Sequence, residues 1–359
     1  MQPFVYNGLP SRVVFGQGTL SRLGEELALL GCERALVLAT PQQHQQAQDV
    51  LQQLGDKGVG IYAKAAMHTP VEITDDAMQV VKELDVDCTI AMGGGSTIGL
   101  GKAIALRTGL AQIAIPTTYA GSEMTPILGE TQNGEKTTQR TLDVLPETVI
   151  YDVDLTLTLP VGMSGTSGIN AIAHAVEALY ARDGNPVITL MAEEGIAALG
   201  RSLPVIANDP SNIEARADAL YGAWLCGACL GSVGMSLHHK LCHTLGGSFN
   251  LPHAETHTIV LPYAVAYNAP AAPDAMARIC RALGCDDAAS GLYDLGRAVG
   301  APSALSELGF SVEDVERATE IATRNPYWNP RDVEANGIRR LLTDAQSGRR
   351  PQADNGGEP

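Results

Sequence analysis

Four histidines and an asparagine between residues 170 and 253 have a spacing that could place them in one site. His239 and His243 are four residues apart, and so are Asn170 and His174, so on helices each pair would project from one face. His253 follows a Gly-Gly break, where a turn can bring it back toward the first pair. Three imidazoles and one side-chain oxygen from two helices are the donors of a divalent metal site.

The oxygen donor of this set is an amide. Asn170 is neutral, so it cannot offset the charge of a divalent ion as a carboxylate does. The sequence therefore predicts a metal-site scaffold that lacks its anionic ligand, and an activity that needs no metal. The imidazoles would then act as hydrogen-bond donors and as a protonated acid, because histidine titrates near neutral pH.

Two cations near the set have two interpretations each. Lys240 follows His239 directly and is turned from its face by about a quarter of a helical turn. It could bind a substrate carboxylate or form an ion pair on the helix surface. Arg331 could clamp a carboxylate or stabilise the entry to a helix. The remaining histidines face another side of the helix or lie outside the set: His238, His44, His68 and His257.

Length and composition exclude several functions. The 359 residues leave room for two domains, and a net charge of −16 argues against a nucleic acid or an anionic membrane as partner. No run approaches the roughly 18 apolar residues of a membrane span, and the N-terminus does not resemble a signal peptide. Seven scattered cysteines are typical of reduced thiols. We therefore expect a cytoplasmic enzyme that draws an anionic substrate into a local basic pocket.

Short β-branched runs alternate with amphipathic helical patterns over residues 1–155. The expected strands are 12–16, 35–40, 58–62, 87–92, 111–115 and 148–151. This rhythm predicts a doubly wound parallel α/β sheet with helices on both faces. Over residues 156–346 Ala/Leu-rich helical segments replace the strands, which predicts an all-helical domain. Residues 347–359, rich in Gly, Arg, Pro and Asp, are expected to form a mobile tail.

A glycine-rich turn follows the strand expected at 87–92. It reads Gly93-Gly-Gly-Ser-Thr97, and a helical pattern comes next. Glycines at such a turn let backbone N–H groups approach a pyrophosphate, and the helix N-terminus adds a favourable dipole. Ser96 and Thr97 are expected to cap that helix and to bond phosphate oxygens. A second hydroxyl-rich turn, residues 116–123, follows the next strand and should face the same edge of the sheet.

The first turn lacks the G-x-G-x-x-G spacing of the common dinucleotide fold, which indicates a related but distinct nucleotide domain. Further along the chain, Lys136 and Arg140 belong to a polar stretch that could contact the cofactor or form a solvated loop. The residues expected at the cofactor are Thr40, Gly94, Gly95, Ser96, Thr97, Thr117, Thr118, Tyr119, Ser122 and Lys136.

These motifs together resemble the iron-containing (group III) alcohol dehydrogenase family, which is structurally allied to dehydroquinate synthase. The resemblance covers nearly the whole chain. Its motifs are Phe15-Gly-Gln-Gly-Thr-Leu20, Gly93–Ser96, Pro116-Thr-Thr118, Asp154-Leu-Thr-Leu-Thr-Leu-Pro160, Asn170-x3-His174, His239-x3-His243 with His253, Leu261-Pro262 and Asn329-Pro-Arg331. Within the family, His-His-Lys-Leu-Cys-His, Pro-Thr-Thr-Tyr-Ala-Gly-Ser-Glu and Asn-Pro-Tyr-x-Asn-Pro-Arg mark a branch of reductases that act on the double bond of an unsaturated keto-dicarboxylate.

The resemblance implies an NAD(P)H-binding domain and a helical domain, with catalysis in the cleft between them. In metal-dependent members an aspartate at the position of Asn170 binds the metal with the counterparts of His174, His239 and His253, so these four are vestigial ligand positions here. The counterpart of His243 handles the substrate or a proton. The implied catalytic residues are His174, His239, His243 and His253, and the implied substrate contacts are Asn170, Lys240, Tyr327 and Arg331.

Three further expectations follow from the resemblance. Thr40-Pro41 stands where many NAD-specific relatives carry an aspartate, so NADPH is admissible alongside NADH. A homodimer is expected, with a small dicarboxylate as substrate. The alternatives are a metal-dependent alcohol dehydrogenase or aldehyde reductase and, more remotely, a dehydroquinate-synthase-like lyase. The lyase would need basic phosphate-binding residues in the helical domain, where the sequence has few.

Overall fold

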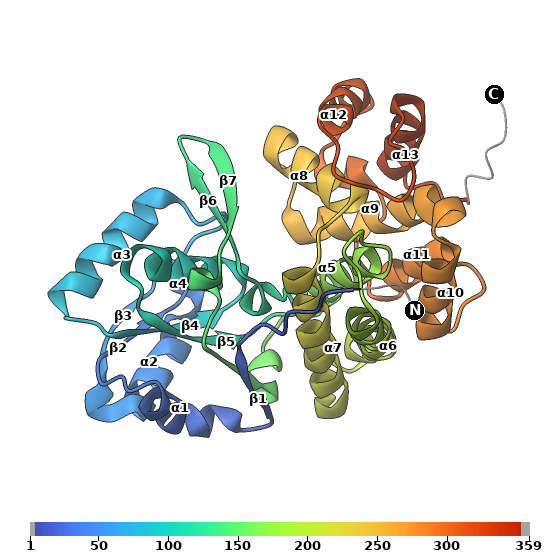
Figure 1. Ribbon diagram of the computed structural model, residues 1–359. Coiled ribbons are helices and arrows are strands. Elements are labelled where there is room, and N and C mark those ends of the chain that lie inside the picture. The colour runs from blue at the N-terminus through green and yellow to red at the C-terminus, as the bar shows by residue number, and fades with distance from the viewer. Residues whose placement is uncertain (1–3, 353–359) are drawn as a thin grey trace. The chain divides into compact units, whose positions relative to one another are not determined.

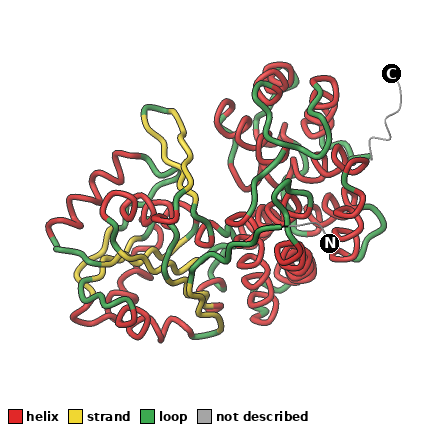
Figure 2. Tube along the Cα trace, viewed as in Figure 1, coloured by secondary structure: helices red, strands yellow, loops and turns green. Residues whose placement is uncertain are grey.

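The computed structural model describes residues 4–352, which divide into two compact units. One unit spans Gly8–Leu159, and the other contains residues 160–352 together with residues 4–7. In the described part of the chain every strand belongs to the first unit (Figure 2). The predicted fold class, a parallel α/β sheet followed by a helical domain, is confirmed.

A six-stranded parallel sheet forms the centre of the first unit (Figure 1). Its strands are β1 (Arg12–Gly16), β2 (Ala35–Leu38), β3 (Gly58–Tyr62), β4 (Cys88–Gly93), β5 (Ala111–Pro116) and β8 (Thr148–Asp152). Their order across the sheet is β1-β8-β5-β4-β2-β3, with each neighbouring pair parallel. All six expected strands are present, and their carboxyl ends share one edge, where an open sheet of this kind binds its ligand.

Helices cover both faces of this sheet (Figure 1). They are α1 (Leu23–Leu29), α2 (His44–Leu54), α3 (Val71–Glu83) and α4 (Gly95–Thr108). Side chains alternate along a strand, so Val37 of β2 packs in the core that contains α1 and α2. Its neighbours Leu36 and Leu38 pack in the core that contains α3 and α4. The continuous apolar run of β2 is therefore explained by burial on both faces.

The polar stretch that contains Lys136 and Arg140 is an antiparallel hairpin, which the sequence did not predict. Its strands are β6 (Ile127–Gln132) and β7 (Glu135–Arg140), joined through Asn133-Gly134, both at positive φ. Such a two-residue turn selects Asn-Gly because both residues must adopt left-handed conformations. Neither of the two interpretations left open for this stretch was a hairpin, because its strands are mostly polar, although Leu128 and Glu130 of β6 are buried. The side chain of Lys136 lies outside what the structure describes.

The second unit is helical throughout its described residues. Its helices are α5 (Val161–Leu179), α6 (Pro186–Asn208), α7 (Ile213–Ser232), α8 (Leu237–Phe249), α9 (His253–Asn268), α10 (Pro273–Leu283), α11 (Ala288–Ala298), α12 (Asp314–Thr323) and α13 (Ala335–Ser347). Within residues 4–352, none of the helices alone is long and apolar enough to cross a membrane; α7 and α8 reach that threshold only as a pair bent by 94°.

One chain segment of this unit differs from expectation, and one expectation is only partly covered by the described residues. Helix α8 continues through Gly246-Gly247, and the break falls instead at Asn250, whose φ of 55° ends the helix. His253 is therefore the first residue of α9 and not part of a turn. In the expected tail, Arg350 forms an ion pair with Asp294. Residues 353–359 lie outside the described residues, so the mobility of that end stays a prediction.

Candidate active site

The carboxyl ends of β2, β4 and β5 bring the predicted cofactor residues together. Gln43, in the first turn after β2, donates its Nε2 hydrogen to Thr117 Oγ1 at 3.0 Å. Thr40 donates its hydroxyl hydrogen to Gln43 Oε1 at 3.2 Å. Gln43 was missed by the sequence analysis, although it lies only three residues after Thr40. Its amide fixes the ends of two strands at the edge where a nucleotide is expected.

Glycine is required at two positions of the first turn. A Cβ on Gly93, whose φ is +152°, would lie 2.5 Å from Thr97 Oγ1. A Cβ on Gly94 would lie 3.0 Å from Thr118 Cγ2. The two hydroxyl-bearing turns therefore contact each other through the space that the missing side chains leave. Nothing lies within 4 Å of the corresponding position on Gly95, which is open to a ligand.

The expectation that Ser96 and Thr97 cap helix α4 is wrong. The N-cap is Gly94, and no side chain accepts a capping hydrogen bond. Ser96 and Thr97 lie inside the first turn, and the buried Thr97 Oγ1 has no partner. The first N–H groups of an uncapped helix point outward without intrahelical acceptors. They are suited to a phosphate group, as the glycine-rich turn predicted.

The remaining residues of the second turn are placed differently from one another. Thr118 contacts the Gly94 turn, and Tyr119 is fully buried within the unit. The carbonyl oxygen of Ser122 accepts a hydrogen bond from the Nζ of Lys102 at 2.6 Å. Lys102 was not singled out by the sequence analysis.

In the helical unit, α5, α8 and α9 carry the predicted histidine set. Asn170, His174 and His239 are each 4% exposed, whereas His243 and His253 are exposed. The rings of His174 and His239 lie 5.2 Å apart between centroids, and those of His239 and His243 lie 6.2 Å apart. The structure thus brings His174, His239 and His243 together as the helical spacing predicted.

Glu177 is a buried carboxylate in contact with this set, and the sequence analysis missed it. It lies one turn after His174 on α5 and is 0% exposed. Its oxygens accept hydrogen bonds from the backbone N–H groups of Ser236 and His238, each at 2.7 Å, and from His239 Nδ1 at 2.8 Å. The carboxylate therefore holds the start of α8 and the orientation of His239 at once.

Three polar atoms of the set have no hydrogen-bond partner: Asn170 Oδ1, His174 Nδ1 and His239 Nε2. Because Glu177 accepts the Nδ1 hydrogen of His239, Nε2 is the nitrogen left for a ligand. Burial, reinforced by the neighbouring imidazoles His239 and His253, lowers the pKa of His174 well below its ordinary value, so His174 is neutral. Buried polar atoms are almost always paired in folded proteins, so these three atoms mark a site for a substrate group or water.

His257 and His238, which the sequence analysis set aside, belong to the same cluster. His257 lies one turn after His253 on α9, and its ring centroid is 4.3 Å from that of His253 and 5.0 Å from that of His239. His257 Nδ1 and His238 Nε2 are 2.9 Å apart, and Cys242 Sγ lies 3.7 Å from the latter nitrogen. Both rings are fully buried, and desolvation lowers the pKa of each well below its ordinary value. They form a neutral layer behind His239 and His253.

The predicted substrate contacts divide into two kinds. Tyr327 Oη is 3.0 Å from His243 Nδ1, and the Lys240 ammonium lies 5.6 Å from the centre of the Tyr327 ring. Within the described residues no carboxylate pairs with Lys240, which favours a role in binding over a surface ion pair. Arg331 instead stacks on Tyr267 at 4.4 Å and donates to its carbonyl oxygen at 2.8 Å, as a structural arginine does.

The residues of the cluster fit a divalent metal ion poorly. The four positions that would bind it offer three imidazole nitrogens and an amide oxygen, all of them neutral. The oxygens of Glu177 are already bonded to three N–H groups. Among the described residues, one group of three metal-ligating side chains has its ligand atoms within 4.8 Å of one another. It consists of His238, Cys242 and His257. Two of these three are already paired with each other.

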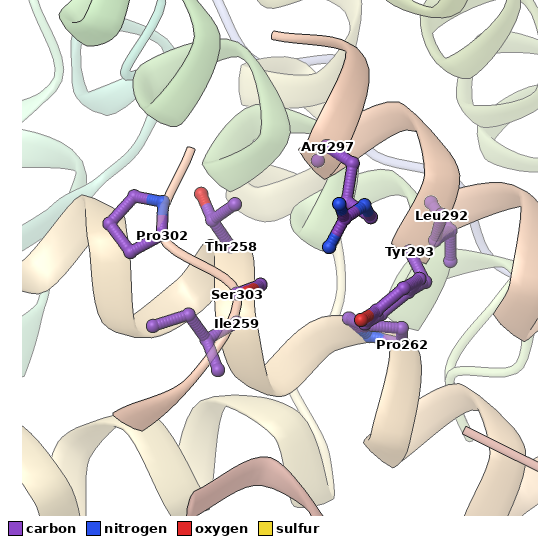
Figure 3. A pocket seen from close by; sticks show the side chains of 9 residues that line it. Thr258, Ile259, Pro262, Leu292, Tyr293, Arg297, Pro302 and Ser303 are labelled. Atoms are coloured by element: carbon purple, nitrogen blue, oxygen red, sulfur yellow. The ribbon is translucent and has the colours of Figure 1, made fainter. Parts of the chain in front are cut away.

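A separate pocket lies between α9 and α11 (Figure 3). Thr258, Ile259 and Pro262 of α9 line one side, and Tyr293 and Arg297 of α11 line the other. None of the predicted site residues contributes to its wall. Although it borders the helix that carries His253, this pocket is not the histidine cluster.

Comparisons with known proteins agree over nearly the whole chain. The model of the iron-containing alcohol dehydrogenases matches residues 10–153, and that of the C-terminal part of the Fe-containing alcohol dehydrogenase family matches residues 164–346. Maleylacetate reductase of Rhizobium sp. (strain MTP-10005) is 56% identical over 352 residues, which are 98% of this chain and 100% of the relative. The crystal structure of maleylacetate reductase from Agrobacterium tumefaciens matches with a TM-score of 0.95 and 56% identity, over 98% of this chain and 100% of that one. An iron-containing alcohol dehydrogenase from Corynebacterium glutamicum matches with a TM-score of 0.93 and 43% identity, over 97% and 98% of the two chains.

Proposed function

The chain belongs to the iron-containing alcohol dehydrogenase family, and from that premise we propose that it reduces the carbon–carbon double bond of maleylacetate to give 3-oxoadipate, with NADH or NADPH as hydride donor. The observation that carries the proposal is 56% identity, over nearly the full length, to a maleylacetate reductase. Such a reaction serves the breakdown of aromatic compounds. It is the oxidoreductase activity that the branch-specific motifs predicted.

The chemistry requires one hydride and one proton. The hydride adds to the alkene carbon β to the ketone, and the π electrons move to form an enolate on the ketone oxygen. Protonation of the α-carbon then restores the ketone. The protein must therefore supply donors for the enolate oxygen and an acid for the α-carbon, and each oriented donor or acid is worth a factor of roughly 10² to 10⁴ in rate.

The histidine cluster can meet both needs. Glu177 orients His239 through Nδ1, so that Nε2 is directed away from that bond and free to contact the substrate. His243 and His253 are the exposed imidazoles of the set, so solvent can reach them and resupply a proton. We assign enolate stabilisation to His239 and His174, and proton delivery to His243 or His253.

A dicarboxylate substrate accounts for Lys240. The protein has a net charge of −16, so a dianion needs a local cation to approach the cluster. Lys240 lies beside Tyr327, which in turn contacts His243, so a carboxylate held by Lys240 would lie next to the proton-handling imidazoles. A homodimer is proposed on the resemblance alone.

We further propose that activity needs no metal, because the ligand set has lost its anionic member at Asn170. Asn170→Asp would restore a carboxylate beside His174 and should raise the affinity for zinc or iron, measured by metal content after dialysis. The unmodified chain should retain turnover after dialysis against a strong chelator. Loss of turnover on chelation, restored by added metal, would instead support the metal-dependent alternative.

The decisive assay follows the oxidation of NADH and of NADPH in parallel, with maleylacetate and with a simple aldehyde. Turnover with maleylacetate and formation of 3-oxoadipate are expected, with little activity on the aldehyde. The reverse preference would contradict the proposed substrate and favour an alcohol dehydrogenase or aldehyde reductase. The ratio of the two cofactor rates also measures how far Thr40 admits a 2′-phosphate.

A further inference from the structure

Lys102 is a fully buried lysine on α4, and its ammonium is surrounded by oxygens of a single loop. The Nζ atom donates to Ser122 O at 2.6 Å, Thr125 O at 2.7 Å, Thr125 Oγ1 at 2.9 Å and Ile127 O at 3.0 Å. The residue is 0% exposed. A buried charge is tolerated only when it is bonded in this way. We call these four oxygens the Lys102 cage.

The cage connects the two turns of the nucleotide site. Lys102 lies seven residues after Gly95, which is two turns of α4, so its backbone is rigidly tied to the first turn. Its cage begins at Ser122, the last predicted cofactor residue of the second turn. The chain reaches Ser122 through Gly121, whose φ of 79° requires glycine. The lysine is the side chain through which α4 fixes the end of the second turn.

The next residue is held from the opposite direction. Tyr151 on β8 donates its hydroxyl hydrogen to Glu123 Oε1 at 2.7 Å, and both side chains are fully buried or nearly so. Burial lowers the pKa of Lys102 to about 7, and the nearby Glu123 carboxyl acts in the opposite direction. The ammonium is thus held by the four hydrogen bonds of the cage and by the charge of Glu123. Residues 122 and 123 are thus clamped between a helix and a strand.

We propose that Lys102 is a positioning residue for the cofactor, which holds the second turn in register with the glycine-rich turn through its cage. Lys102 does not touch the nucleotide. It acts through Ser122, whose carbonyl oxygen it binds; earlier in the same turn, the Thr117 N–H donates to Gly93 O at 3.1 Å and Thr118 lies beside Gly94. This inference rests on the proposed function, because it takes these turns to be the site of the nicotinamide nucleotide.

The test replaces Lys102 with methionine, which keeps the length of the side chain and removes its donors. Fluorescence titration should show that Lys102→Met binds NADH and NADPH roughly tenfold more weakly, because the second turn loses the hydrogen bonds that hold it in position. The kcat at saturating cofactor should stay within about twofold, because the histidine cluster is untouched. A folded Lys102→Met protein with unchanged Kd overturns the inference.

Tyr62→Phe is the matched control. Tyr62 donates to Ile73 O at 3.0 Å and to Asp76 Oδ2 at 2.8 Å within the same unit, and neither acceptor belongs to the two turns. The Tyr62→Phe variant should have a lower thermal midpoint and an unchanged Kd for the cofactor. If Tyr62→Phe and Lys102→Met weakened cofactor binding equally, the inference would also be overturned.

If Lys102→Met does not fold, Thr125→Val, which removes one cage oxygen, should weaken cofactor binding by about twofold to fivefold. An unchanged Kd in Thr125→Val overturns the inference too. Failure of the unmodified protein to bind either nucleotide would refute the proposed function first.

Discussion

Each unit contains a buried polar network, and the two networks differ in how completely they are paired. In the Lys102 cage, the buried ammonium has four protein oxygens as hydrogen-bond acceptors. In the histidine cluster Asn170 Oδ1, His174 Nδ1 and His239 Nε2 have none. Folded proteins pair nearly all buried polar groups, so a paired network fixes geometry whereas an unpaired one awaits a ligand.

This comparison separates residues that position from residues that react. Loss of a cage contact should change binding and leave the chemical step intact. Loss of a cluster residue should change the chemical step, because in the proposed mechanism these residues act on the reacting atoms and contribute most in the transition state.

The largest effect is expected at the exposed imidazoles. His243→Ala or His253→Ala should lower kcat by roughly 10² to 10⁴ while KM changes little, as for loss of a general acid or an enolate donor. Steady-state kinetics with maleylacetate measure both constants, and circular dichroism checks folding. Near-normal kcat in both folded variants would mean that the cluster is a relic of metal-binding relatives.

Glu177→Gln should have the next largest effect. The glutamine keeps the shape of the side chain but loses the charge that accepts three N–H donors. We expect kcat to fall by about 10- to 100-fold, the usual size for loss of a group that orients a reacting histidine. Asp183→Asn, which also loses a carboxylate bonded to a backbone N–H (that of Gly234), is the control for general destabilisation. An equal loss in both variants would contradict the positioning role.

Gly94→Val tests the cofactor side of the comparison. A side chain here would lie 3.0 Å from Thr118 and would push the two turns apart. We expect KM for NADH and NADPH to rise by roughly tenfold or more, with a smaller change in kcat. Gly95→Ala, where the added carbon meets nothing within 4 Å, separates ligand contact from distortion of the turns. Unchanged cofactor KM in folded Gly94→Val would place the pyrophosphate elsewhere.

The smallest effect is on stability at acid pH. Burial lowers the pKa of His174, His238 and His257 well below the ordinary value of 6.5, so the native state leaves them neutral. Below that pH the unfolded state binds more protons, so the free energy of unfolding falls as pH decreases from 6.5. The slope should reach at most about 1.4 kcal/mol per pH unit for each group. Denaturant unfolding between pH 7.5 and 5.5 measures it.

His257→Asn should flatten this slope, because it removes one of the three groups. The cage offers the contrast: the pKa of Lys102 is about 7 in place of the ordinary 10.5, so between these two values the unfolded state binds more protons and the free energy of unfolding rises with pH. A slope below pH 6.5 that is unchanged in His257→Asn would show that the ring is not buried as a neutral group.

Much of the fold could be predicted because its strands are apolar and continuous. Residues 35–38 are buried on both faces and stand out in the sequence, whereas β6 and β7 are mostly polar and form a hairpin that periodicity cannot reveal. The pair of turns at β4 and β5 was predictable from glycines and hydroxyls. Gln43 and Lys102 were not, because each acts through contacts across the sheet edge or to a loop 20 or more residues away.

The histidine cluster shows the same division. Helical spacing gave Asn170 with His174 and His239 with His243, since these pairs depend only on local geometry. His257 was missed because α9 was not expected to begin at His253. Since the helix does begin there, the four-residue spacing places the rings of His253 and His257 on one face. Glu177 was missed because its partners Ser236, His238 and His239 lie 59, 61 and 62 residues away in the sequence.

Asn170 has a consequence for how this scaffold can evolve. Asparagine and aspartate codons differ by a single base, and Glu177 already orients His239 beside His174. On the proposed metal-free mechanism, one mutation at Asn170 would therefore add the anionic ligand to this set while α5, α8 and α9 stay as they are. The proposal implies that reductases built on this scaffold can gain or lose a metal by a single base change.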